Sequence, residues 1–227
     1  MSIKHCLQTA FSAALPIMAG YLAIGVPCGI MEAQIGLSPW LAFVVSMTFY
    51  SGAGQFMVGG MQLAGAPAAS IIASVSFVNT RQMLYAAAFS PYFAQVRKPL
   101  SFFFSATVTD ESFGVNLTRF QQGSWTPAQA TAVNVLCMFS WAAANALGAV
   151  AGDALPIPAT IASFAMTSIF ICLLVSQRHN RITAVVVAVS MLSVCLFKIV
   201  GLEGPAILFG ACLGVACGLV VRKRVSA

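Results

Sequence analysis

Charged residues are scarce in this sequence: only 7% of its 227 residues are Asp, Glu, Lys or Arg. Soluble domains average about 25% charged residues, because a surface that faces water has to be covered with them. Apolar residues make up 59% of the chain, and the mean hydropathy is +0.92. The composition therefore excludes a soluble protein and predicts an integral membrane protein that forms a single domain over residues 1–227.

The chain also lacks the alternation of apolar and polar residues that closed membrane barrels need. Its apolar runs are continuous and rich in Ala, Leu, Val and Phe, a pattern that favours helices in a bilayer. The length provides for about seven or eight helical passes of roughly 20 residues each. The predicted fold class is therefore an all-α polytopic membrane protein without a soluble domain.

Several motifs that carry chemistry are absent as well. The seven cysteines are scattered and include no C-x-x-C pair, which argues against a disulfide framework or a metal site. No G-x-x-x-x-G-K-[ST] loop is present, so ATP is not expected to drive the protein directly. The net charge of +6 comes from residues at segment ends, and no basic face suited to nucleic acid exists. We expect no cofactor, no metal and no nucleic-acid partner.

Hydropathy divides the chain into about eight predicted membrane segments. They cover roughly residues 10–31, 39–63, 67–95, 99–119, 127–150, 159–176, 182–200 and 205–221. The second segment carries Tyr-Ser-Gly-Ala-Gly-Gln at Tyr50 to Gln55, which continues a helix poorly, so we expect half-helices at 39–50 and 54–63. Such a break at membrane depth persists only where protein covers it or a cavity adjoins it.

The distribution of charged residues predicts the orientation of the chain. The basic groups expected in the cytoplasm are Lys4, Arg178, Arg181 and Arg222 to Arg224, and the acidic groups expected outside, in loops, are Glu32, Asp153 and Glu203. Both termini are then cytoplasmic. Eight passes would leave Arg97 and Lys98 outside, whereas six passes plus two re-entrant hairpins, formed by segments three and four, would return them to the cytoplasm. The sequence leaves both arrangements open.

Polar residues stand at the midpoints of three successive segments. These groups are Ser51 to Gln55, Asn79 to Arg81, and Thr109 to Glu111. A charge at membrane depth costs about 2.5–3.5 kcal/mol on insertion scales, so a charge retained there usually has a function. Broken helices that meet near the bilayer midplane form the sites of many secondary transporters, and their N-termini suit a carboxylate. We therefore predict a solute site in which Arg81 pairs with Asp110 or Glu111, or binds the anionic end of the solute.

Each of these features also has a purely structural interpretation. Arg81 would lie at a membrane surface if residues 67–78 and 83–95 formed separate short helices, and Asp110 and Glu111 would stabilise a helix N-terminus. For Gly52 and Gly54 this interpretation is close helix packing. Packing is the favoured role for Asn134, Asn145 and the stripe of Gly210, Gly214 and Gly218.

Three longer motifs contain these polar groups and occur in a fixed order. They are Phe-Tyr-Ser-Gly-Ala-Gly-Gln-Phe at 49–56, Asn-Thr-Arg-Gln-Met-Leu-Tyr at 79–85 and Thr-Asp-Glu-Ser-Phe at 109–113. Together with Pro16, Gly20, Gly25 and Gly29, they resemble the AzlC family over essentially the whole chain. The resemblance implies the large subunit of a branched-chain amino acid exporter in the bacterial inner membrane, working with a small membrane subunit of the AzlD type. One departure is Gln82, where the family often has His.

The pattern and the resemblance together define the expected site and function. The candidate substrate-binding residues are Gly52, Gly54, Gln55, Asn79, Arg81 and Tyr85, and the candidate coupling or ion-pair residues are Asp110 and Glu111. We expect a secondary exporter of neutral apolar amino acids such as leucine, with lipid and the small subunit as partners and a homo-oligomer left open. The alternatives are a channel or transporter for another small solute or ion, and a structural subunit. An enzyme is not expected, because no His and no second Asp accompany Asp110 at depth.

Overall fold

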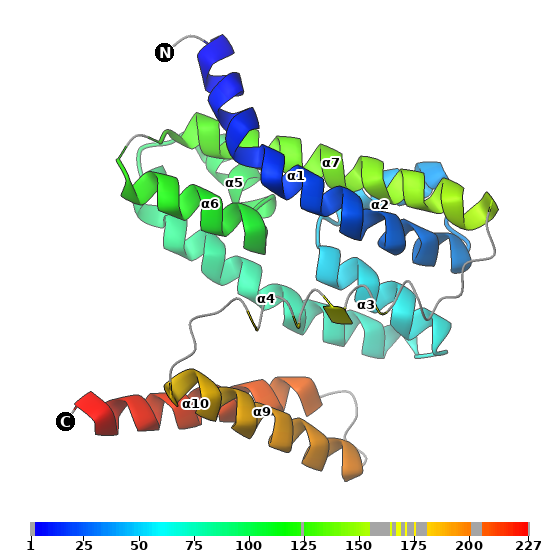
Figure 1. Cartoon of the computed structure of the whole chain (residues 1–227), viewed down its shortest axis with the longest axis vertical. Helices are drawn as coiled ribbons and strands as arrows, with labels where there is room; N and C mark the ends of the chain where they lie inside the picture. Colours follow the sequence, from blue (N-terminus) through cyan, green and yellow to red (C-terminus); the bar gives the residue numbers. More distant parts are fainter. Residues whose placement is uncertain are drawn as a thin grey trace.

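The computed structural model describes residues 3–123, 125–154, 164, 167–168, 171, 175, 181–200 and 206–226, and every regular element in these ranges is a helix (Figure 1). The helices are α1 (Ile3–Gln34), α2 (Pro39–Thr48), α3 (Gly52–Leu63), α4 (Ala68–Phe93), α5 (Lys98–Ala106), α6 (Asp110–Gln121), α7 (Pro127–Ala154), α9 (Arg181–Ile199) and α10 (Ala206–Ser226). The all-α prediction is confirmed for this part of the chain. Most of the predicted segment 159–176, Arg178 and the loop with Glu203 lie outside the described residues.

Helices α1 and α7 lie side by side and run in the same direction (Figure 1). Small residues bring their backbones into contact: a Cβ atom at Gly25 would stand 2.6 Å from the Cβ of Ala144, and one at Gly29 would collide with the carbonyl oxygen of Asn145. Within the described residues, these two helices are the ones long and apolar enough to cross a membrane, by length and composition. The pair forms the frame on which the neighbouring helices pack.

The second predicted segment folds back on itself as a helical hairpin. Helix α2 ends and α3 begins on either side of residues 49–51. The hydroxyl of Tyr50, at the tip, reaches that of Tyr21 partway along α1, whereas Gly59 in α3 packs on Met31 near the C-terminal end of α1. Helix α2 also starts at that end, because only a short connection joins it to α1. The first hairpin therefore opens at the C-terminal end of α1.

The fourth predicted segment forms a second hairpin, of α5 and α6, with its tip at residues 107–109. The Oγ1 atom of Thr109 lies 2.8 Å from the Tyr21 hydroxyl. From there α6 runs toward the N-terminal end of α7, where the Asn116 amide donates to the Asn134 side-chain oxygen at 3.1 Å. The two hairpins thus approach from opposite ends of the bundle, and their tips meet beside Tyr21; in Figure 1, α3 and α6 run from the middle of the bundle to opposite ends.

Helix α4 joins the two hairpins as one continuous helix of 26 residues with Arg81 in its middle. The alternative that divides it into short helices at 67–78 and 83–95 is therefore wrong. The polar residues beside Arg81 do not open the helix, since the Thr80 hydroxyl donates to the carbonyl of Phe77 at 2.6 Å and is satisfied within the helix.

The segments that fold back are consequently the second, where the sequence predicted a break, and the fourth. The alternative arrangement with re-entrant hairpins had placed them in the third and fourth segments. Each break coincides with an N-cap residue that starts a new helix. Ser51 Oγ accepts a hydrogen bond from the backbone N–H of Gly54 at 3.1 Å. Thr109 and Ser112 form a reciprocal capping box, with distances of 3.4 Å and 3.0 Å.

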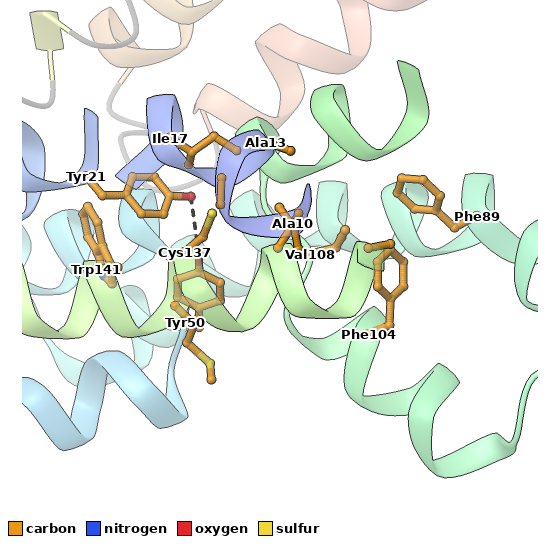
Figure 2. Close-up of a cluster of buried hydrophobic side chains, with 14 of the residues drawn as sticks. Ala10, Ala13, Ile17, Tyr21, Tyr50, Phe89, Phe104, Val108, Cys137 and Trp141 are labelled. Atoms are coloured by element: carbon orange, nitrogen blue, oxygen red, sulfur yellow. Dashed lines mark hydrogen bonds between the residues drawn. The ribbon is translucent and has the colours of Figure 1, made fainter. Parts of the chain in front are cut away.

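Aromatic side chains hold the second hairpin against α4. Phe93 stacks on Phe104 with ring centroids 4.2 Å apart, and Phe89 meets the same ring edge-on at 5.0 Å. Such pairs contribute about 0.5–1.5 kcal/mol each beyond the area they bury. Figure 2 shows Phe89 and Phe104 at one end of the buried cluster and Trp141 at the other. This cluster fixes the position of the tip that carries Asp110 and Glu111.

Helices α9 and α10 pack on each other through the glycine stripe of α10. A Cβ atom at Gly218 would stand 2.5 Å from Val186, and one at Gly214 would collide with Ser190. The predicted packing role of the stripe is therefore confirmed.

Candidate solute-binding site

A cavity of about 50 Å³ lies where the two hairpin tips meet α1, α4 and α7. Its lining residues are Tyr21, Ile24, Tyr50, Ser51, Gly52, Ala53, Phe56, Arg81, Gln82, Thr109, Asp110, Glu111 and Trp141. One water needs about 10–15 Å³ of such volume, so the cavity has room for about four waters. The lining combines one cation, two carboxylates, hydroxyls and apolar side chains, and this mixture suits a small solute that carries both charges and an apolar part.

The N-terminus of α3 brings free backbone N–H groups to the cavity. Gly52 and Ala53 are the first residues of α3, and their N–H groups have no carbonyl partner within the helix. The first turn of α3 has no acidic residue, so the partial positive charge of this helix end is not compensated. The first turn of α6 contains both Asp110 and Glu111. The two tips therefore differ in charge, one positive and one negative.

Arg81 and Asp110 form an ion pair beside these tips. The guanidinium Nη2 lies 3.0 Å from Asp110 Oδ2, and the side chains are 29% and 27% exposed. Tyr85, one helical turn beyond Arg81, donates its hydroxyl to Oδ1 of the same carboxylate. Both oxygens of Asp110 are thus occupied, whereas the Nε of Arg81 is buried and has no hydrogen-bond partner in the described part of the chain. Arg81 thus has one donor that no described residue uses.

Glu111 belongs to a chain of hydroxyl groups that joins the two tips. The Tyr21 hydroxyl donates to Glu111 Oε2 at 2.8 Å and lies at the same distance from Thr109 Oγ1. The Tyr50 hydroxyl approaches the Tyr21 oxygen at 3.5 Å, as the dashed line in Figure 2 marks. Within the described residues, Glu111 has no basic partner. A carboxylate held by a hydroxyl group alone can accept a positively charged group from a solute.

The predicted site residues fall into two sets. Those that line the cavity are Gly52, Arg81, Asp110 and Glu111, and those that stand behind the lining residues are Gly54, Gln55, Asn79 and Tyr85. The second set supports the first, since Asn79 accepts a hydrogen bond from the Ser51 hydroxyl at 2.6 Å. The amide of Gln82, a further lining residue on α4, reaches the Tyr50 carbonyl at 3.5 Å. These contacts tie the first tip to α4.

The structural interpretations apply to some of the same residues. A Cβ atom at Gly52 would stand 3.2 Å from the Trp141 ring, so this glycine both lines the cavity and permits close packing. Asp110 and Glu111 both stand in the first turn of α6, where carboxylates stabilise a helix N-terminus. Asn134 connects helices as expected, because its amide donates to the Phe104 carbonyl at 3.3 Å.

Sequence reasoning missed several residues of the lining. Tyr21 and Ile24 on α1 and Trp141 on α7 lie inside apolar segments that carry no polar pattern. The one signal in the sequence is that Tyr and Trp keep a polar tip, which needs a partner when it is buried. That signal does not say where the partner stands.

Glu32 lies in the last turn of α1, 3% exposed, and not in the loop predicted for it. The helix continues past it because Gly36, with φ +89°, ends it instead. The N–H groups of Gly36 and Leu37 bond to the carbonyls of Ala33 and Glu32, at 2.9 Å and 3.0 Å, which is a Schellman ending. Gln55, predicted to bind substrate, donates its amide to Glu32 at 2.8 Å and points away from the cavity.

The composition, the two membrane-length helices and the charged cavity define a helical membrane protein with an internal polar site. The family model described as AzlC protein matches residues 16–155, which contain both hairpins and every residue that lines the cavity. The chain belongs to the AzlC family, as the motifs indicated.

Relatives with curated names are similar over most of their length. An uncharacterized membrane protein of Helicobacter pylori is 28% identical over 177 residues, covering 78% of this chain and 77% of the relative. The branched-chain amino acid transport protein AzlC of Bacillus subtilis is 26% identical, covering 77% and 69%. The inner membrane protein YgaZ of Escherichia coli is 24% identical, covering 91% and 86%. No solved structure matches the chain.

Proposed function

We propose that the chain is the large subunit of a secondary exporter of neutral apolar amino acids, with the cavity as its binding site. The observation that carries the proposal is the meeting of a positive and a negative helix tip at one cavity. A free amino acid carries a carboxylate and an ammonium group on the same carbon atom and is complementary to such a pair of tips. The name of the Bacillus subtilis relative supports the branched-chain class of substrate.

The carboxylate of the solute binds at the first tip. The N–H groups of Gly52 and Ala53 donate to it, as helix N-termini do to anions. Arg81 adds a full positive charge and its unpartnered Nε. Because Asp110 already holds the other side of the guanidinium, Arg81 stays oriented when no solute is bound.

The ammonium group binds at the second tip, beside Glu111. Glu111 lacks a basic partner in the described part of the chain, whereas Asp110 is engaged by Arg81 and Tyr85. The apolar side chain of the solute then faces Ile24, Phe56 and Trp141, which complete the lining. A whole leucine is larger than the about four waters that the cavity holds, so transport requires one tip to withdraw and open the site.

Replacing Glu111 with Gln tests this orientation. We expect Glu111→Gln to weaken leucine binding about tenfold or more and to leave the deaminated acid with the same side chain less affected, because only leucine carries the ammonium group. Competition against labelled leucine, measured with purified protein in liposomes with and without the small subunit, reads out both affinities. An equal loss for both ligands would contradict the assignment. Absence of leucine binding, together with flux of inorganic ions through the same liposomes, would favour a channel or ion transporter.

The hairpins also indicate how the chain crosses the membrane. With two re-entrant hairpins, α4 crosses beside the more apolar α1 and α7, because its 26 residues are long enough although polar residues interrupt its middle. The predicted segments 159–176, 182–200 and 205–221 bring the proposed total to six passes. Arg97 and Lys98 then lie at the same end of the bundle as Lys4, where the positive-inside rule places cytoplasmic residues. Both termini are cytoplasmic in this arrangement, and the protein lies in the bacterial inner membrane.

This topology predicts the side from which two positions react. A thiol introduced by Arg97→Cys should be labelled by an impermeant maleimide from the cytoplasmic side only. Trp40→Cys is the matched control, because Trp40 is 70% exposed at the opposite end of the bundle and should react from the outside only. Labelling of both positions from the same side would exclude the re-entrant arrangement.

A small AzlD-type subunit remains the proposed partner, with membrane lipid around the complex. Exposed apolar residues on α4, among them Ile72, Met83 and Leu84, give a partner helix or lipid a surface to cover. Dependence of leucine transport on the co-expressed small subunit is the measurement that checks this.

A further inference from the structure

Glu32 is a buried carboxyl group that stands apart from the cavity. Its Oε1 accepts a hydrogen bond from the Gln55 amide at 2.8 Å. Its Oε2 is buried and has no hydrogen-bond partner in the described part of the chain. An ionised carboxylate that is buried without compensation is costly, and such a group normally takes up a proton or a cation.

The helices packed around Glu32 supply no positive charge. Helices α2 and α3 contain no ionisable residue, and the ionisable residues of α7 are Cys137 and Asp153, the side chain of the latter lying outside the described part. On α1 the nearest ionisable side chain is Cys28, one turn before Glu32. The one ion pair among the described residues joins Arg81 and Asp110. No basic group in the described part of the chain therefore neutralises Glu32, which leaves a proton or a cation from solution for this role.

Gln55 connects Glu32 to the lining of the cavity. Its Nε2 donates to Glu32 and also to Ser46 Oγ, both at 2.8 Å, and its Oε1 accepts from the indole N–H of Trp141 at 2.5 Å. An indole N–H can only donate, so the amide has one orientation, with Nε2 toward Glu32. Trp141 lines the cavity and meets the ring of Tyr21 edge-on at 5.2 Å. A change at Glu32 is thus transmitted through one amide to the first turn of α3.

We propose that Glu32 is a proton-binding site that couples solute movement to a proton gradient, an inference that rests on the proposed function. A metal cation fits less well, because it needs several oxygen ligands. Oε2 has no hydrogen-bond partner, and the described residues contain no group of three His, Cys, Asp or Glu that could hold a metal ion. Glu32 takes a proton from one side of the membrane onto Oε2 and releases it to the other side.

Protonation changes the strength of the contact with Gln55. A hydrogen bond to an ionised acceptor is roughly twice as strong as one between neutral groups. The deprotonated form therefore holds the first turn of α3, and with it Gly52 and Ala53, in the arrangement described above. The protonated form releases this turn and favours withdrawal of the first tip.

The first test is spectroscopic and does not depend on any solute. Infrared difference spectra of the full chain in lipid, recorded across a pH titration, report the carbonyl band of a protonated carboxyl. We expect Glu32→Gln to remove one titrating band and Glu32→Asp to retain a shifted one. An unchanged set of bands in Glu32→Gln would overturn the proposal, even if the protein transported no amino acid.

The second test separates exchange from coupled transport. Glu32→Gln resembles the protonated form and can still accept from Gln55, so leucine counterflow should persist, while net transport driven by a pH gradient falls about tenfold or more, the scale of a typical coupling free energy. Full gradient-driven transport in Glu32→Gln would overturn the proposal. Glu111→Gln should instead reduce both leucine counterflow and gradient-driven net transport. Absence of leucine counterflow in the wild-type chain would contradict the proposed function, but the infrared test of Glu32 would remain valid.

Discussion

Replacing Arg81 with Gln is expected to reduce leucine affinity about 30-fold or more. In the proposed binding mode, the substitution removes the positive charge and the unpartnered Nε that hold the solute carboxylate. It also leaves Asp110 with only Tyr85 as a partner. Removing one member of a hydrogen-bonded charge pair costs about 2–5 kcal/mol in binding, which corresponds to this range of affinity. Calorimetry on the purified protein measures the change directly.

A double variant separates binding of the solute from maintenance of the ion pair. If Arg81 served only to neutralise Asp110, the combination Arg81→Gln with Asp110→Asn would restore binding, because no unpaired charge would remain. If Arg81 holds the solute carboxylate, the double variant binds no better than Arg81→Gln alone. Arg119→Gln is the matched control, since Arg119 lies over the Trp125 ring at 5.7 Å, outside the cavity, and its loss should leave affinity unchanged.

The sequence was most informative where polar residues interrupt long apolar runs. The three midpoint groups could be recognised because ionic side chains at depth are rare and costly. The structure brings Ser51, Arg81, Asp110 and Glu111 together at one cavity. Of the two carboxylates expected as partners of Arg81, it is Asp110 that forms the ion pair. Which of these residues holds the solute remains a prediction.

The direction of the segments could not be read from hydropathy. A pair of short helices that folds back and a single helix that crosses the membrane can contain the same number of apolar residues. The hydropathy profiles of segments 39–63 and 99–119 therefore looked like those of full membrane passes. The distinguishing signal was local: Thr109 is followed by two carboxylates and by Ser112, the pattern of a capped helix start. At Arg81 no such pattern exists, and α4 is continuous.

Long-range pairing explains the remaining errors. Hydrogen bonds to residues far away in the sequence determine the positions of Tyr21, Trp141 and Glu32. A single sequence does not show such contacts. The sequence predicts a loop at Glu32 because Gly36 and Pro39 follow it closely. The buried contact with Gln55, 23 residues later, depends on the first hairpin folding back.

The geometry also explains why the site lies at this place in the fold. A long helix followed by a hairpin that opens at its C-terminal end occurs twice, as α1 to α3 and as α4 to α6, in opposite directions. Repeats of opposite direction are frequent in secondary transporters, where the site forms at their interface. Here the two N-capped tips differ in charge because glycines follow Ser51 and carboxylates follow Thr109. One architecture thus gives an asymmetric site, as the proposed amino-acid substrate would require.

The contact between α1 and α7 leads to the second large expected effect. Gly29→Ala should lower the thermal midpoint of the purified protein, because the new Cβ would collide with the backbone of Asn145 and Ala149. The carbonyl oxygen of Asn145 and the backbone nitrogen of Ala149 cannot rotate away as a side chain can, so the two helices must separate. Overpacking of this kind costs about 1–3 kcal/mol and sometimes more.

Gly20→Ala on the same helix is the matched control. No atom lies within 4 Å of the position that a Cβ at Gly20 would occupy. Alanine is also favoured over glycine inside a helix by about 0.5–1 kcal/mol, so this variant should keep or raise the midpoint. The two substitutions add the same methyl group to the same helix and differ only in what α7 places beside it. Equal midpoints for both would mean that α1 and α7 do not pack through Gly29, and the hairpin tips, which are positioned against both helices, would lose their support.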